Sequence, residues 1–347
     1  MVRIGIVGVG GIAQNVHIKQ LKTYEDVKIT AICDINEETL NKVGDDLNIP
    51  AEYRFTDYKE LIDCEIVDAV EVCTPNHMHV KVATDAIKKG KAVEIEKPLA
   101  LNYEETISLA EELKKNPTPN MMCMSYRFRP AVRYAKQMME QKLLGDIISI
   151  DVQYLKSSAF MKGRRLDWRF VKKYAGSGVI GDLAVHLVDL ATFLVGDLKK
   201  LCAQTKIVVK ERKKLDSEEI APVETEDYCS FLGELESGAL ANFLITRCAL
   251  GNANTIKFDI FGTNGIISLN LNKPDEISYC IGEDVDTNTW HTEKASEEFF
   301  AEQEKSFVNL VKGINTKYQP TIDDGIRHQK INDAILLSAE KEEWVEL

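Results

Sequence analysis

The first residues suited to chemistry form a glycine-rich turn, GVGGIA at positions 8–13, between a strand-like apolar run and an amphipathic run. In this G-x-G-x-x-A pattern Gly8 permits the tight turn, and Gly10 lets backbone amides approach a pyrophosphate. A helix beginning near Gly11 would offer free N–H groups and a positive dipole end to phosphates. The turn predicts a dinucleotide site, and the alternative is a glycine-rich turn without a ligand. The candidate cofactor contacts here are Gly8, Gly10, Gly11 and Ile12.

The second apolar run ends in Asp34. A carboxylate at this place accepts hydrogen bonds from the adenosine ribose hydroxyls and repels a 2′-phosphate. The next residues, Ile35 and Asn36, supply no arginine to offset that repulsion. NAD is therefore the predicted cofactor and NADP the less favoured one. The alternative role of Asp34 is the N-cap of a helix that starts near Glu37.

Two further polar segments follow predicted strands in the first third of the chain. TPN at 74–76 stands at the carboxyl end of the sheet, where ligands bind in open α/β folds, although it could also be a turn whose asparagine caps the next helix. EKP at 96–98 follows another strand. A lysine beside a cofactor can hold its ammonium against a substrate hydroxyl, whereas the alternative for Lys97 is an ion pair with Glu96. His77 and His79 lack the accompanying cysteines or histidines of a zinc site, so no metal is expected.

Three ionisable residues are spaced along one apolar helix, predicted from about Val179 to Val195. Asp182, His186 and Asp189 stand at i, i+4 and i+7, so one helical face presents all three. Histidine titrates near neutral pH, and an adjacent carboxylate strengthens it as a base. The spacing indicates an acid–base site, and the alternative is a polar stripe at a domain interface.

The loop before that helix, KGRRLDWR at 162–169, holds four basic residues in a chain of formal charge −12. Guanidinium groups bind phosphate or carboxylate oxygens in bidentate fashion, so the loop could bind an anionic sugar. The alternative is a solvated loop that pairs with acidic neighbours. The candidate substrate-binding residues of the whole chain are Lys97, Arg127, Arg164, Arg165, Asp182, His186 and Asp189.

Strand-like and helix-like runs alternate in the first third, which indicates βαβ units and a parallel sheet. A proline-containing segment at 114–120 must end a helix, so we place a Rossmann domain at 1–122 and a second domain at 123–347. The second part shows period-2 runs with turn signals at 237–238 and 264–265. This predicts an α+β domain with an open, mostly antiparallel sheet. Helices expected over Glu297–Lys312 and Asp324–Trp344 could pack back on the first domain.

The composition is that of a globular protein of two domains: 347 residues, 44% hydrophobic and 28% charged. The negative charge argues against nucleic acid or an anionic membrane as partner. Eight scattered cysteines without a C-x-x-C pair suggest reduced thiols. No signal-peptide pattern and no uninterrupted apolar run of about 18–20 residues occur, so a cytoplasmic location is expected.

Jointly the glycine turn, TPNHMH at 74–79, EKP at 96–98 and DLAVHLVD at 182–189 resemble the Gfo/Idh/MocA oxidoreductases over the whole chain. The resemblance implies that Lys97 is catalytic, that His186 is the acid/base and that Asp182 contacts the substrate. The family usually has glycine where this chain has Ala184, which adds one methyl group. The resemblance also implies a dimer or tetramer through the outer face of the second sheet. The further cofactor contacts that it implies are Thr74, Pro75, Asn76, His79, Glu96, Lys97, Trp168 and Arg169.

The expected reaction is NAD-dependent oxidation of a secondary hydroxyl of a sugar, an inositol or a sugar phosphate. One alternative is an NAD-dependent glycosidase that oxidises a ring carbon transiently, which the same residues would serve. Another is a non-catalytic dinucleotide sensor that regulates a partner protein. Retention of both Lys97 and His186 argues against the sensor. The substrate class, a sugar or polyol, is implied by the family resemblance and not by any individual residue.

Overall fold

The computed structural model describes residues 1–314 and 316–347, which form two compact units. The first unit comprises Met1–Cys123 and Glu302–Gln329, and the second comprises Met124–Ala301 and Lys330–Leu347. The units therefore divide one residue after the boundary placed from the sequence. A stretch near the C-terminus belongs to the first unit and not to the second.

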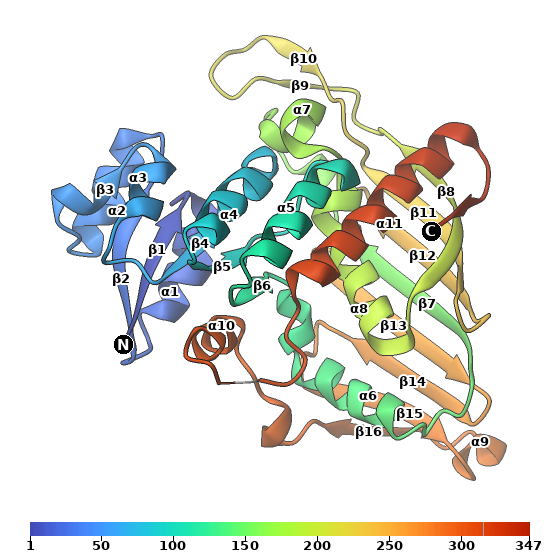
Figure 1. The fold of residues 1–347 in the computed structure, drawn as a ribbon. Coiled ribbons are helices and arrows are strands. Elements are labelled where there is room, and N and C mark those ends of the chain that lie inside the picture. Colours follow the sequence, from blue (N-terminus) through green and yellow to red (C-terminus); the bar gives the residue numbers. More distant parts are fainter. Residues whose placement is uncertain (315) are drawn as a thin grey trace. The chain divides into compact units, whose positions relative to one another are not determined.

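The first unit is built on six parallel strands in the order β3-β2-β1-β4-β5-β6 (Figure 1). The strands are β1 Val2–Val7, β2 Val27–Cys33, β3 Arg54–Phe55, β4 Ala69–Val72, β5 Ala92–Ile95 and β6 Asn120–Met122. This is the strand order of a Rossmann fold, and its direction reverses between β1 and β4, where ligands bind in such folds. The predicted parallel sheet is confirmed.

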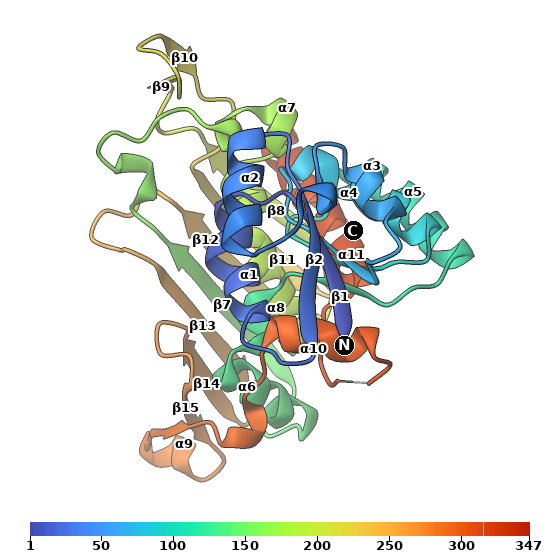
Figure 2. The ribbon, with the colours of Figure 1, turned by 90° about the vertical axis from the view of Figure 1, so that its left-hand side faces the viewer.

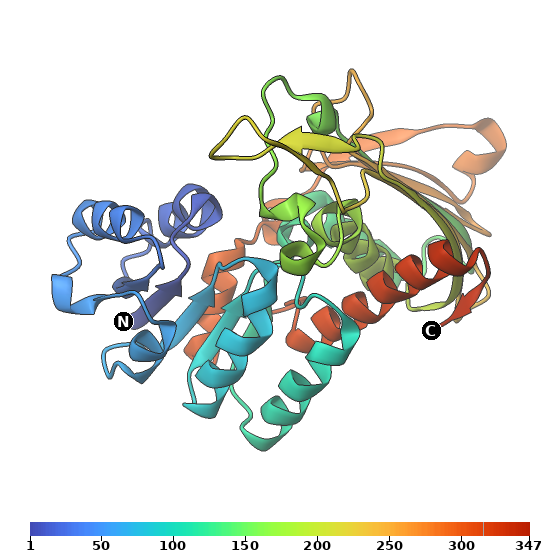
Figure 3. The same cartoon turned by 90° about the horizontal axis from the view of Figure 1, so that it is seen from above.

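Helices lie on both faces of this sheet, as Figure 3 shows from above, so its central strands are almost entirely buried. The helices of this unit are η1 Ala13–His17, α1 Ile18–Leu21, α2 Glu37–Asp46, η2 Ala51–Tyr53, α3 Tyr58–Asp63, η3 Asn76–Met78, α4 His79–Lys88, α5 Tyr103–Lys115 and α10 Gln303–Val311, with the start of α11 Ile322–Lys341. The helix expected over Glu297–Lys312 is wrong in its first part. Glu297–Phe299 is a separate 3-10 turn, because the backbone at Phe300 and Glu302 is extended and interrupts the helical hydrogen bonds.

The second unit is built on nine strands in the order β16-β15-β14-β13-β7-β12-β11-β8-β17. They are β7 Ile147–Leu155, β8 Leu198–Lys206, β11 Tyr228–Leu235, β12 Leu240–Thr246, β13 Thr255–Gly262, β14 Gly265–Asn270, β15 Glu276–Ile281, β16 His291–Lys294 and β17 Val345–Glu346. Only the β7–β12 pair is parallel, so the predicted mostly antiparallel sheet is confirmed. Both predicted hairpins form, with Gly238 at φ +88° and Gly265 at φ +140°.

One face of this sheet packs against helices, and the other face carries no helix from the described part of the chain (Figure 2). The helices of this unit are η4 Ser125–Phe128, α6 Pro130–Glu140, η5 Ser158–Phe160, η6 Trp168–Phe170, α7 Lys172–Ala175, η7 Ile180–Ala184, α8 Val185–Val195, α9 Asp284–Thr287 and η8 Glu297–Phe299, with the C-terminal part of α11. The segment Lys172–Val195 has the length and mean hydropathy, 1.7, to cross a membrane, but 78% of its apolar window is buried inside the protein. Its apolar part, η7 with α8, lies in the core of the second unit.

A small hairpin of β9 Glu211–Lys213 and β10 Ile220–Pro222 forms a separate two-stranded sheet. The sequence analysis missed it, as it missed β3 and α3. Strands of two or three residues contain too few side chains to show an alternating pattern, and the hairpin sequence is largely charged.

Candidate active site

The glycine turn has the geometry that a dinucleotide requires. Gly8 has φ +88°, and a Cβ there would lie 2.8 Å from the backbone carbon and oxygen of Cys73, so only glycine fits where the β1 and β4 loops meet. A Cβ on Gly10 would meet nothing within 4 Å, so this position is open to a phosphate. The helix begins at Gly11, and Ala13 is fully buried behind it. These residues fit NAD.

Asp34 is held beside the turn by two backbone donors. Its Oδ2 accepts from the Val9 N–H at 2.9 Å, and its Oδ1 accepts from the Asn36 N–H at 2.9 Å. The alternative that Asp34 caps α2 is wrong, because Asn36 is the N-cap and accepts from the Thr39 N–H. The Val9 and Asn36 backbone N–H groups thus hold the Asp34 carboxylate beside the glycine turn. This position suits a contact with the ribose of a dinucleotide.

His79 joins the loops that follow β4 and β5. Its Nδ1 lies 2.7 Å from the Pro98 carbonyl oxygen and its Nε2 lies 2.8 Å from the Thr74 carbonyl oxygen. The ring is buried, and burial lowers its pKa. The capping alternative for Asn76 is wrong, since α4 is preceded by Met78 without any side-chain cap. His79 therefore positions the two loops, and its contact with a cofactor stays a prediction.

Glu96 is fixed on both sides just before the candidate catalytic lysine. Its Oε2 accepts from the Lys97 backbone N–H at 3.0 Å, and its Oε1 lies 3.1 Å from Nε2 of His17. Burial raises the pKa of Glu96, but the hydrogen bond and charge of His17 outweigh it, so the pKa is lowered overall. The sequence analysis missed His17, which a G-x-G-x-x-A pattern does not include.

The helix of the second unit places Asp182 in a π-helical turn, η7, and His186 at the start of α8. Such π turns are frequent at functional sites. The His186 ring packs edge-on against Tyr126, with centroids 4.9 Å apart, and the Tyr126 hydroxyl lies 3.1 Å from that of Tyr154. Burial raises the pKa of Tyr154, as do Tyr126 and the charge of Asp182. His186 thus neighbours Tyr126, and the charge of Asp182 acts on Tyr154, which is bonded to Tyr126. The sequence pattern suggested neither tyrosine.

Asp189, the third residue of the predicted face, has a different partner. Its Oδ1 lies 2.6 Å from Nη2 of Arg127, which also donates through Nε at 2.8 Å. Both side chains are almost fully buried, and Arg127 lies over the Phe193 ring. These two candidate substrate-binding residues neutralise one another, and their contact with a substrate stays a prediction.

A buried carboxylate holds the start of the helix that carries Asp182. Glu226 accepts from the Gly178 N–H at 2.6 Å and from the Ile180 N–H at 3.0 Å, which are free donors of the first helical turn. Its neighbour Asp227 accepts from Nε of Arg247 at 2.6 Å. The sequence analysis missed these residues too, because an acidic pair before a strand is also a common surface pattern.

The basic loop is bonded largely to the protein itself. Arg165 donates to the carbonyl oxygens of Lys214 and Ser217 at 2.9 and 2.7 Å and pairs with Glu218 at 2.6 Å. Arg164 donates to the Ser158 carbonyl, and Arg169 stacks on Trp168 with its guanidinium carbon 4.4 Å from the ring centroid. For Arg165 this favours the ion-paired alternative over an anion site.

Comparison with known proteins agrees with the fold and with a dinucleotide-binding first unit. Residues 2–123 match the oxidoreductase family with an NAD-binding Rossmann fold, and residues 132–268 match the GFO/IDH/MocA C-terminal domain. The chain is an NAD-binding oxidoreductase. It belongs to the Gfo/Idh/MocA family.

The similar proteins include several sugar and polyol dehydrogenases. Levoglucosan dehydrogenase of Pseudarthrobacter phenanthrenivorans is 30% identical over 325 residues, which cover 84% of this chain and 83% of that protein. Glucose-6-phosphate 3-dehydrogenase of Bacillus subtilis is 27% identical, with 76% and 72% covered. A solved structure of levoglucosan dehydrogenase with NADH and levoglucosan has a TM-score of 0.89 at 27% identity, with 99% of each chain covered.

Proposed function

We propose that the protein oxidises a secondary hydroxyl of an uncharged sugar or polyol, with NAD as the hydride acceptor. The observation that carries this proposal is the placement of His186 beside Tyr126, with Asp182 one turn earlier, in a chain that has an NAD turn. The relatives named for levoglucosan and inositol oxidation support the substrate class.

In this proposal bound NAD supplies the hydride acceptor, and the protein orients the substrate and moves its proton. His186 takes the proton of the reacting hydroxyl, and Asp182 positions that hydroxyl. The Lys97 ammonium stabilises the negative charge that develops on the substrate oxygen. Glu96 holds the Lys97 backbone through its 3.0 Å hydrogen bond, which fixes the starting point of that side chain.

The choice of an uncharged substrate rests on the basic loop. A phosphate site needs guanidinium donors that are free to turn toward the ligand. The Arg165 guanidinium instead donates to two carbonyl oxygens and pairs with the Glu218 carboxylate. Burial lowers the pKa of Arg164, as do the charges of Arg247 and Arg212 beside it, and its guanidinium is stacked on Phe170. Both arginines are therefore explained by contacts within the protein.

The test is NADH formation from a panel of inositols, free sugars, anhydrosugars and sugar phosphates, with NADP in parallel. We expect turnover of uncharged substrates with NAD, and the Arg165→Ala variant should keep the same KM. A response confined to phosphorylated sugars, with a KM that rises in Arg165→Ala, would overturn the choice of substrate class. Release of the aglycone from an aryl glycoside without net NADH would favour a glycosidase instead.

We further propose that the helix-free face of the second sheet binds a second copy of the chain, in the cytoplasm. The interface is supported by Leu232 and Leu240 on this face, which are more than half exposed. The location is supported by the eight cysteines, which are all free thiols. Light scattering on the Leu232→Glu variant should show a smaller species than the wild-type protein. An unchanged mass would count against this interface.

A further inference from the structure

The interior of the first unit holds an unusual pair of carboxyl groups. Glu71 and Glu94 lie in the middle of the adjacent central strands β4 and β5, directly opposite one another in the register, and both are fully buried. Like charges opposite one another on neighbouring strands destabilise a sheet. Apolar residues would satisfy both positions, so the pair needs a physical reason.

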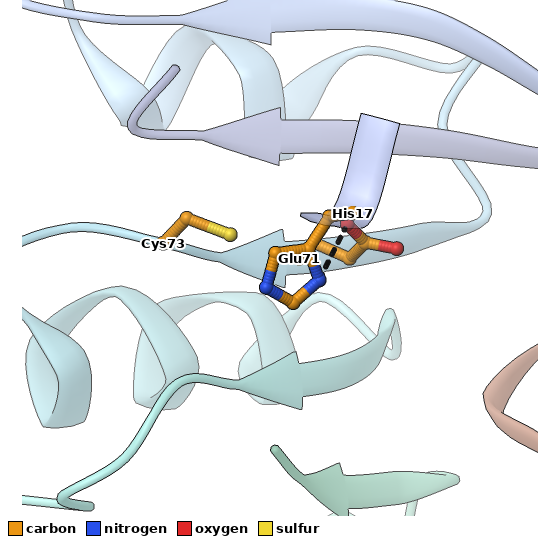
Figure 4. Close-up of side chains that lie close together, drawn as sticks. All are labelled: His17, Glu71 and Cys73. Atoms are coloured by element: carbon orange, nitrogen blue, oxygen red, sulfur yellow. Dashed lines mark ion pairs between the residues drawn. The ribbon is translucent and has the colours of Figure 1, made fainter. Parts of the chain in front are cut away.

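Two further residues complete a cluster around this pair. His17 comes from the π-helical turn η1, and its Nδ1 lies 3.6 Å from Oε2 of Glu71 (Figure 4). The same nitrogen lies 3.0 Å from Oε1 of Glu304. Glu304 comes from α10 and is also fully buried. One donor atom from each of His17, Glu71, Glu94 and Glu304 lies within 4.8 Å of all the others.

The cluster is short of positive charge and of hydrogen-bond donors. Within the described residues, no N–H group donates a hydrogen bond to either carboxyl oxygen of Glu71 or of Glu94. Their partner in the cluster is another carboxyl group, that of Glu304. An isolated buried carboxylate costs several kcal/mol or more. A single imidazolium at His17 would still leave three carboxyl groups around one charge. The site must therefore hold either extra protons or a cation.

The orientation of His17 favours a cation. A histidine that ligates a metal commonly donates its other ring N–H to a carboxylate, which fixes the ring and its tautomer. Nε2 of His17 lies 3.1 Å from Oε1 of Glu96, which leaves Nδ1 directed at the cluster. With bonds of about 2.0–2.2 Å, ligand atoms of one ion lie roughly 2.9–3.6 Å apart. The two separations at Nδ1, 3.0 and 3.6 Å, fall in this range.

We propose that His17, Glu71, Glu94 and Glu304 bind one divalent first-row transition-metal ion in the interior of the first unit. One imidazole with three carboxylates suits manganese, iron(II) or zinc better than calcium or magnesium, which prefer all-oxygen sites. No motif predicted this site, because its four ligands come from four separate segments of the chain. The ion links β4, β5, η1 and α10, and through His17 and Glu96 it supports the loop that carries Lys97.

In the alternative explanation the cluster binds no metal ion, and some of its carboxyl groups are protonated. Burial raises the pKa of Glu71 and Glu94 well above the usual range, and the charge of Glu304 raises it further. A protonated glutamate and a glutamine are nearly the same in shape and charge. Glutamine variants therefore separate the two accounts, because they preserve a protonated cluster and remove a metal ligand.

The test is elemental analysis of the full-length protein, purified from cells supplied with manganese, iron and zinc and then exchanged into chelator-treated buffer. We expect about one transition-metal ion per chain, as for a structural site that loads during folding. Glu71→Gln and Glu94→Gln each remove a ligand, so they should weaken metal affinity by more than about 10- to 100-fold, the loss typical of changing a residue that only supports a ligand. The metal content and the Tm of both variants should therefore fall below those of the wild-type protein. The matched control Glu111→Gln, at an exposed position on α5, should change neither.

Wild-type protein without a transition metal, together with glutamine variants that are as stable as wild type, would overturn the proposal. If a variant does not fold, the wild-type protein still decides the question. Unfolding it in the presence of a chromogenic chelator should release the ion, and release of none would contradict the site. X-ray absorption should show only nitrogen and oxygen ligands. A sulfur ligand would instead place the ion on Cys73, which also lies within reach of His17 and Glu71 (Figure 4), and would contradict the three-carboxylate set.

Discussion

The buried carboxylates of the two units differ in the partners that the chain gives them. In the second unit each one has a partner from the chain: Asp189 has Arg127, Asp227 has Arg247, and Glu226 has two backbone N–H groups. In the first unit Glu71 and Glu94 have neither an arginine nor an amide donor among the described residues. The difference indicates that charge in the second unit is balanced by the fold itself, whereas charge in the first unit requires something added to the chain.

The largest effect on stability should come from breaking a balanced pair. Arg127→Met leaves Asp189 buried and unpaired, which should cost about 3–5 kcal/mol. Urea unfolding followed by circular dichroism measures the loss, with Lys162→Met at an exposed position as the control. The double variant Arg127→Met/Asp189→Leu should regain most of the stability. If Arg127→Met alone is as stable as wild type, the ion pair between Arg127 and Asp189 does not contribute to the free energy of unfolding.

A smaller effect is expected at the helix start. Glu226→Ala removes the acceptor of two N–H groups, and a hydrogen bond to a charged group contributes about 1.5–3 kcal/mol. Because this residue positions the turn that carries Asp182, kcat should fall together with stability, while the KM for NAD stays unchanged. Glu226→Gln keeps an acceptor oxygen and should restore part of kcat. Equal kcat in both variants would argue for a purely structural role.

The smallest effect is expected at the partly buried Asp34, whose carboxylate accepts hydrogen bonds from two backbone N–H groups. Asp34→Ala removes both the ribose contact and the repulsion of a 2′-phosphate. The preference for NAD over NADP should drop about tenfold, which corresponds to 1.4 kcal/mol. The ratio of kcat/KM with the two cofactors measures this change, and an unaltered ratio would remove Asp34 from cofactor selection.

Local patterns predicted the parts of the molecule that depend on neighbouring residues. Gly8 and Gly10 indicated the turn, and the alternating runs around 237–238 and 264–265 indicated hairpins that the structure confirms. Residues that act through distant partners left no such pattern. Glu226 faces Gly178, and His17 faces Glu96 and Glu304, each across many positions of sequence. Only folding brings these groups together.

The predicted face of Asp182, His186 and Asp189 shows the same limit. The helical spacing was correct, but a sequence period does not reveal that Arg127 pairs with Asp189. Nor does it reveal that η7 is a π-helical turn. The spacing of residues along a helix predicts which side chains share one face. The residues that contact this face come from other helices and strands, and the spacing does not identify them.

The central claim is that His186 acts on the substrate hydroxyl of an NAD-dependent dehydrogenase. Its most direct test is the turnover of the His186→Ala variant, measured as NADH formation, with NAD affinity determined by fluorescence on the same samples. The account predicts that kcat falls by about 10²- to 10⁴-fold, the contribution of a positioned acid–base group, while the Kd for NAD stays as in the wild-type protein. Unchanged turnover, or activity lost only in proportion to NAD binding, would contradict it.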